Sequence, residues 1–156
     1  MAMSASVACN CFVSGLGAPC LLEAEADLAG RLCAVADCSD EDLATFDEWL
    51  SNGCAHDGHR FVWEEISNWT DLGIIVRVLA DHAEAFPALG ASVGGTTDTF
   101  DLNMPDRSAA ALAELDSYDV LCATEPQLPR WMPSVAQKLR KVFEASVALD
   151  RPVVWD

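Results

Sequence analysis

Apolar and polar residues alternate in several short stretches of the chain, a pattern typical of strands. In the first of these, Val7, Cys9, Cys11 and Val13 share one face. A break at Ala29-Gly30 favours two short strands around a turn in another stretch. We therefore expect strands over 3–13, 59–66 and 153–155, with a two-stranded hairpin within 20–36.

Apolar residues recur at helical spacing elsewhere. The clearest helix is 40–51, where Ser39 and Asp42 have the spacing of a capping box and Asn52-Gly53 predicts a left-handed glycine cap. Further helices are expected from about residue 70 to before Pro87, over 107–116, and over 134–149 with Ser134 as its cap. The remaining signals predict a hairpin of 92–93 and 97–102 around Gly94-Gly95, a short strand at Tyr118–Cys122 and an extended connection over 123–133.

These elements mix helices and strands without a regular βαβ order. The pattern predicts an α+β fold, with about four helices packed on a small mixed or antiparallel sheet. A length of 156 residues suits one domain, so we expect residues 1–156 to form a single globular unit.

The net charge of the chain limits the classes of partner that it can bind. It has 25 acidic and 9 basic residues, a formal net charge of −16, yet 51% of its residues are hydrophobic. That hydrophobic content predicts a folded core, and the charge excludes nucleic acid and anionic membranes as partners. The sequence contains neither a signal peptide nor an apolar run long enough for a membrane span, so we expect a cytoplasmic protein.

Seven cysteines, an odd number, argue against a disulfide framework and favour reduced, buried thiols without a cofactor. An alternative is a zinc site built from Cys9, Cys11, Cys54 and His56, with His59 close by in the sequence. In an extended strand the Cα atoms of Cys9 and Cys11 lie roughly 6–7 Å apart on one face. The chain contains no C-x₂-C pair, and we therefore expect no metal while keeping zinc as the alternative.

No sequence motif indicates an enzyme. No nucleophile signature surrounds any cysteine or serine, and neither glycine cluster, 15–17 or 94–95, is followed by the Lys and Ser/Thr of a phosphate-binding loop. Paired carboxylates such as Glu64-Glu65 point to opposite faces of a strand and favour a solvated surface over an acid–base pair.

An acidic stretch with interleaved tryptophans is the strongest candidate for a binding surface. Residues 40–65 contain eight carboxylates and a single basic residue, Arg60. Such a surface is either simply solvated or steers a basic partner toward aromatic anchors. The predicted partner-binding residues are Asp40, Glu41, Asp42, Asp47, Glu48, Trp49, Asp57, Trp63, Glu64 and Glu65.

Three short motifs carry a resemblance to known proteins: SASVACNCF at 4–12, FDEW at 46–49 followed by CAH at 54–56, and ISNW at 66–69. Over roughly the first 90 residues the chain resembles small bacterial proteins without an assigned activity, and in its acidity it resembles immunity proteins. The resemblance implies an inhibitor that covers the basic active-site cleft of a cognate toxin acting on nucleic acid or nucleotides. The alternative is a small zinc-binding protein with a structural or catalytic Cys/His site.

Overall fold

The computed structural model describes residues 2–35, 38–94 and 102–156. It confirms the α+β class, and the described residues form five α-helices where four were expected. In chain order the elements are β1 (Ala2–Ala8), β2 (Ala24–Ala26), β3 (Leu32–Ala34), α1 (Asp40–Asn52), the 3₁₀ turn η1 (Asp57–His59), β4 (Arg60–Asn68), α2 (Trp69–Asp81), α3 (Pro87–Gly94), α4 (Pro105–Thr124), α5 (Met132–Leu149) and β5 (Val153–Trp155).

Three strands form an antiparallel sheet in the order β4-β1-β5, and β2 pairs with β3 in a separate hairpin. In β1 the alternate residues Met3, Ala5 and Val7 are buried beneath the helices. Val7 lies opposite Val62 in β4 and opposite Val153 in β5. An irregularity in the β1–β4 register follows Val7, directly before the chain leaves the sheet.

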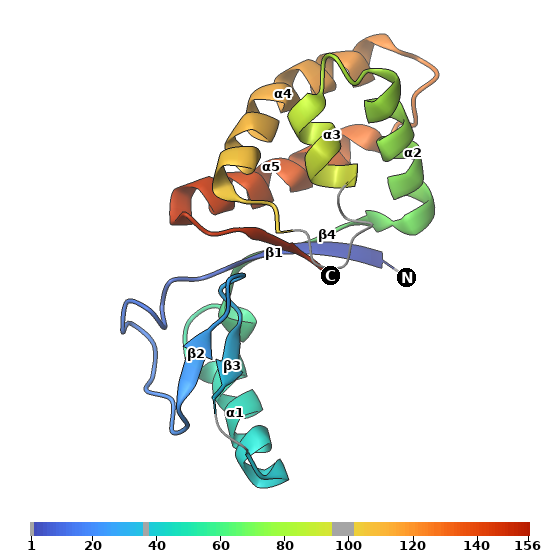
Figure 1. The fold of residues 1–156 in the computed structure, drawn as a ribbon. Coiled ribbons are helices and arrows are strands. Elements are labelled where there is room, and N and C mark those ends of the chain that lie inside the picture. The colour runs from blue at the N-terminus through green and yellow to red at the C-terminus, as the bar shows by residue number, and fades with distance from the viewer. Residues whose placement is uncertain (1, 36–37, 95–101) are drawn as a thin grey trace.

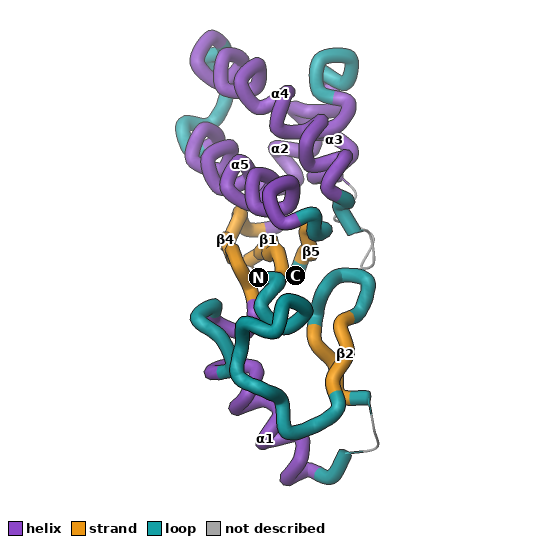
Figure 2. The backbone as a smooth tube through the Cα atoms, turned by 90° about the vertical axis from the view of Figure 1, so that its left-hand side faces the viewer, coloured by secondary structure: helices purple, strands orange, loops and turns teal. Residues whose placement is uncertain are grey.

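Helices α2 to α5 cover one face of this sheet (Figure 1). The main hydrophobic core lies between the two layers and includes Leu79, Leu115, Leu139 and Phe143, each at most 1% exposed. Turning the molecule shows the same layers, with the long helices α4 and α5 side by side (Figure 2).

The chain between β1 and β4 forms a small lobe on the other side of the sheet (Figures 1 and 2). We define the small lobe as residues 9–59, described at 9–35 and 38–59; it holds the β2–β3 hairpin, α1 and η1. None of its described residues belongs to the main core. Its buried apolar side chains in the described ranges are only Cys9, Ala29 and Phe46.

The start of α1 agrees with the sequence. The Ser39 hydroxyl accepts a hydrogen bond from the Asp42 amide, and the Asp42 carboxylate accepts hydrogen bonds from the Ser39 hydroxyl and amide. These bonds to Ser39 lower the pKa of the Asp42 carboxyl. The expected left-handed cap at Gly53 was wrong, because its φ is −71°. Glycine is required there for space, since a Cβ atom would lie 2.7 Å from Trp49 Nε1.

The hairpin of 24–34 and the last strand, 153–155, confirm two further expectations. The first strand, however, ends at Ala8 and not at residue 13. Residues 10–16 turn back on themselves, with the Ser14 amide donating to the Asn10 carbonyl at 2.9 Å. Cys11 therefore lies in a turn, where the sequence pattern had placed it on a strand.

Two expected β-elements are helical instead. Ser92 and Val93 belong to α3, so the first arm of the predicted hairpin is wrong; its second arm lies almost wholly outside the described residues. Tyr118–Cys122 lies within α4, which continues eight residues beyond the expected end at Asp116. There Tyr118 is buried and its ring contacts Phe86 edge to face at 5.9 Å, so tertiary packing decides between two readings of a short apolar run.

The expected cap of the last helix was also wrong. Helix α5 begins at Met132, and the Ser134 hydroxyl donates to the Trp131 carbonyl at 2.8 Å without accepting from a helix amide.

The basic residues of α5 are engaged by the protein itself. Arg140 pairs with Asp116 at 2.9 Å and Asp119 at 3.1 Å, and Lys141 pairs with Glu64 at 2.7 Å. Lys138 donates to the Glu65 carbonyl at 2.6 Å. These contacts tie α5 to α4 and β4, leaving the acidic residues of the small lobe without cations from this helix.

Candidate metal centre

Four metal-ligating side chains meet where the small lobe joins the sheet. Cys9 and Cys11 follow β1, while Cys54 and His56 lie in the loop between α1 and η1. The Cys9 amide donates to the His59 carbonyl at 2.8 Å, which extends the β1–β4 pairing and holds the two segments together. The pairing of the strands thus brings together residues that are 45 positions apart in the sequence.

Three of the six distances between the ligand atoms are close to those around a tetrahedral zinc ion. The Sγ atoms of Cys9 and Cys54 are 3.8 Å apart, and His56 Nδ1 lies 3.3 Å from Cys11 Sγ and 3.8 Å from Cys54 Sγ. All four ligand atoms lie within 4.8 Å of one another. Zinc bonds of about 2.3 Å to sulfur and about 2.0–2.1 Å to nitrogen place neighbouring ligand atoms of a tetrahedron about 3.5–3.8 Å apart.

Hydrogen bonds and burial govern the thiols of the cluster. Burial, opposed by a hydrogen bond from the Cys11 amide, raises the pKa of the Cys9 thiol to about 12. The His56 amide lies 3.3 Å from Cys54 Sγ in position to donate to it, as amides do to metal-bound thiolates. A bound cation replaces thiol protons, so metal binding would deprotonate this group of cysteines.

His59 lies next to the cluster without belonging to it. Its Nδ1 is 4.0 Å from Cys9 Sγ, and its ring packs on the indole of Trp49 with centroids 4.7 Å apart. Among the described residues its buried Nε2 atom has no hydrogen-bond partner. Burial lowers the pKa of this imidazole, which favours the neutral form. Its left-handed backbone, with φ of 56°, turns the chain from η1 into β4.

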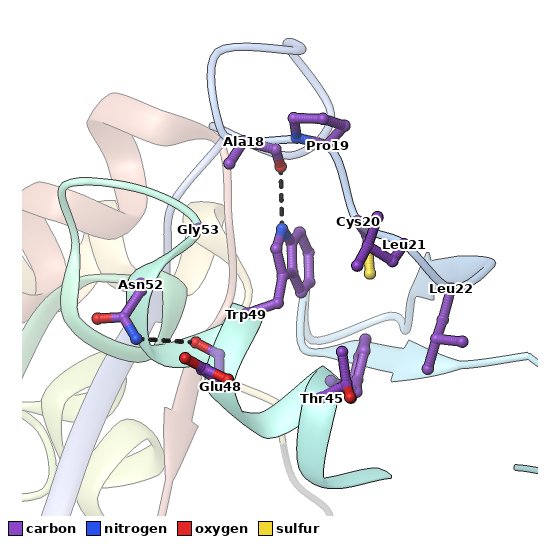
Figure 3. Close-up of a pocket in the computed structure, with 11 residues that line it drawn as sticks. Ala18, Pro19, Cys20, Leu21, Leu22, Thr45, Glu48, Trp49, Asn52 and Gly53 are labelled. Carbon is purple, nitrogen blue, oxygen red and sulfur yellow. Dashed lines mark hydrogen bonds between the residues drawn. The ribbon is translucent and has the colours of Figure 1, made fainter. Parts of the chain in front are cut away.

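Trp49 is the centre of the small lobe. Its indole contacts the ring of Phe12 at 5.9 Å and the ring of Phe46 at 5.6 Å. Its Nε1–H donates to the Ala18 carbonyl at 2.9 Å, a bond drawn in Figure 3. Trp49 therefore connects α1 to the loop that follows the first two cysteines, and its N–H is already occupied within the protein.

The ten residues predicted to bind a partner fall into separate groups. Asp40, Glu41, Asp42, Asp47, Glu48 and Trp49 lie on α1, Asp57 begins η1, and Trp63, Glu64 and Glu65 lie on β4. In the described chain none of the α1 carboxylates forms an ion pair with Lys or Arg, whereas Glu64 is bound to Lys141. Trp63 is 48% exposed on β4. Five of the predicted carboxylates thus share helix α1, and the β4 residues form a separate group.

A groove beside α1 was missed from the sequence. Segment 18–22 lies against α1 and encloses a volume of about 380 Å³ lined mostly by apolar atoms (Figure 3). The only local signal was the apolar run Cys20-Leu21-Leu22 after Pro19, which resembles any short strand. Its pairing with α1 depends on tertiary structure.

Comparison with protein-family models, with curated proteins and with solved structures gave no significant match. Within the described residues, none of the helices combines the length and apolar character that crossing a membrane requires. The function of the site therefore has to be argued from its own geometry.

Proposed function

We propose that this chain is a zinc-binding protein in which a Cys₃His site holds the small lobe in its folded form. The observation that carries the proposal is the spacing of Cys9, Cys11, Cys54 and His56, whose ligand atoms lie within 4.8 Å of one another. Three thiolates and one imidazole are a usual ligand set of structural zinc. Because protein atoms would fill all four positions, no coordination site is left for a substrate, and the role is structural.

The chemistry of the ligands favours zinc over other common ions. Thiolate sulfur is a poor ligand for magnesium and calcium, which prefer oxygen. Iron–sulfur clusters are usually held by four cysteines, and the described cluster offers three with one histidine.

The small size of the lobe also favours stabilisation by a metal. Segments below about 70 residues seldom bury enough apolar surface to fold alone, and natural ones are often stabilised by disulfides or a metal. The small lobe buries few apolar side chains and, in the described ranges, has free cysteines without a disulfide. A zinc ion would join its two ends at the edge of the sheet.

The first test is metal content. Protein purified without chelator should contain about one zinc per chain, and cobalt substituted for zinc should give the absorption of a tetrahedral thiolate complex. A Cys33→Ser variant is the matched control, because Cys33 is an exposed cysteine of the same lobe outside the cluster. A Cys11→Ser variant should bind zinc much more weakly. A folded wild-type chain that takes up no zinc at micromolar concentration would contradict the proposal.

The charge of α1 supports a second candidate function, binding of a basic protein. Five carboxylates on this helix form no ion pair within the described chain, and the basic residues of α5 are engaged elsewhere. A cytoplasmic immunity-type inhibitor that covers the basic active-site cleft of a cognate toxin is one protein of this kind. Such steering weakens steeply as salt rises.

Native mass spectrometry of the chain isolated from its source cells tests this second function. We expect a basic protein at fixed stoichiometry, lost when Asp47 and Glu48 are both replaced by lysine. Replacing Asp81 and Glu84, two exposed acidic residues outside the small lobe, by lysine is the control for the same change in charge. Binding that survives the α1 double reversal would exclude this helix from the interface.

A further inference from the structure

The groove of the small lobe has the size of a binding site for one large side chain. Its volume of about 380 Å³ falls at the lower end of the range of about 300–1,000 Å³ typical of ligand pockets. Cys20 and Leu22 lie on one wall, Thr45 and Trp49 on the other, as Figure 3 shows. Apart from Glu48, the residues that line the groove are uncharged, so the groove suits an apolar group.

Exposed apolar residues continue from the groove onto the surface of the small lobe. Leu21, at the groove itself, is 85% exposed, and Leu16 before it is 80% exposed. Leu43, two residues before Thr45 on α1, is 46% exposed. An apolar groove with such neighbours is typical of a surface that another molecule covers.

The negative charge of the small lobe favours a positively charged partner. Glu48 lines the groove, and its neighbour Asp47 is exposed on the same helix. Residues 9–59 contain ten Asp and Glu but a single basic residue, Arg31. Arg31 is already paired with Asp27 at 2.9 Å. An anionic ligand would be repelled from this lobe, while a cationic segment would be attracted and aligned.

The walls of the groove are attached to the candidate zinc ligands. Gly53 directly precedes Cys54, and the loop after Cys11 leads to Ala18. The Ala18 amide donates to the Gly53 carbonyl at 2.6 Å, so the two walls meet beside the cluster. Because the small lobe buries few apolar side chains, we expect this hydrogen bond to hold the walls together only while a metal joins Cys11 to Cys54.

We propose that the groove between segment 18–22 and α1 receives an apolar, preferably aromatic, side chain from a basic segment of a protein partner, and that it forms only when the Cys₃His site holds its metal. This inference rests on the proposed zinc site and adds the chemistry of the partner to it. The acidic residues of α1 attract the segment, and the groove then anchors one of its side chains.

The test uses the full chain loaded with zinc and three synthetic heptapeptides. The first has one phenylalanine flanked on each side by three lysines; in the second, alanine replaces phenylalanine; in the third, glutamates replace all lysines. Titration calorimetry should show that the phenylalanine peptide binds about ten- to a hundredfold more tightly than the alanine peptide, the effect of burying one such side chain. The glutamate peptide should not bind measurably.

Three variants separate the contribution of the groove from that of the charge. Thr45→Trp should fill the groove and abolish the preference for phenylalanine, while Ala44→Trp, on the same helix outside the groove, should retain it. Replacing Glu41 and Asp47, two exposed carboxylates of α1 outside the groove, by lysine should weaken both lysine peptides and leave their ratio unchanged. Equal binding of the phenylalanine and alanine peptides to the wild type would overturn the groove as an anchor site. If phenylalanine amide alone bound as tightly as the peptide, the site would be one for small molecules.

Metal content, measured in every sample, separates this inference from the proposed function. A chain with one zinc that shows no phenylalanine preference would overturn the inference and leave the zinc site standing. A preference that persists unchanged after complete removal of the metal would overturn the dependence on the Cys₃His site. A chain that binds no zinc in any preparation would overturn the proposed function itself.

Discussion

Replacement of Cys54 by serine is expected to release the metal and unfold the small lobe while the helices on the sheet stay folded. Structural zinc sites contribute an apparent binding free energy of about 10–16 kcal/mol, so one of four ligands accounts for roughly 2.5–4 kcal/mol. Zinc affinity should therefore fall about a hundred- to a thousandfold. The lobe has few buried apolar side chains to replace this contribution, whereas the main core contains none of its described residues.

Hydrogen exchange resolved by segment measures this effect. In the Cys54→Ser chain, and in the wild type after metal removal, amides of α1 and the β2–β3 hairpin should lose protection while those of α4 and α5 keep it. The Cys33→Ser chain should match the wild type, because Cys33 lies outside the cluster. Full protection of α1 in a metal-free chain would contradict a structural role for the ion.

Replacement of Phe143 by alanine should destabilise the helices on the sheet and leave the metal site intact. Phe143 is 0% exposed in the core between α5 and the sheet, and truncation of a buried phenylalanine costs about 3–5 kcal/mol. That is a large part of the free energy of unfolding of a typical domain, about 5–15 kcal/mol. The midpoint of urea unfolding, followed by far-ultraviolet circular dichroism, should fall accordingly.

Val147→Ala provides the matched control in the same helix. Val147 is 43% exposed, and its truncation should change the free energy of unfolding by about 0.5 kcal/mol or less. Under native conditions the Phe143→Ala chain should still bind one zinc per chain, because the cluster shares no residue with the main core. A loss of zinc together with helical structure would mean that the lobe and the helices unfold as one unit.

The sequence by itself determined the elements whose signals are local. Ser39 and Asp42 predict the start of α1 because a capping box involves residues three positions apart, and the segment 153–155 forms the last strand as expected. The α+β class followed from the order of such elements. The four residues of the metal cluster were recognised as possible ligands by their type. Their spacing in the sequence includes no C-x₂-C pair, so buried thiols remained the preferred interpretation.

Tertiary structure decided what depends on distant contacts. The β1–β4 pairing brings Cys9 and Cys11 to Cys54 and His56, and no local pattern contains that pairing. The stretch Tyr118–Cys122 fits a strand equally well by its sequence, and it is helical because Tyr118 packs in the core. The Lys141–Glu64 ion pair likewise removed one predicted binding residue from the free acidic surface. Local propensity acts over a few residues, whereas a site requires the chain to return to the same place, and only the packed fold specifies where it returns.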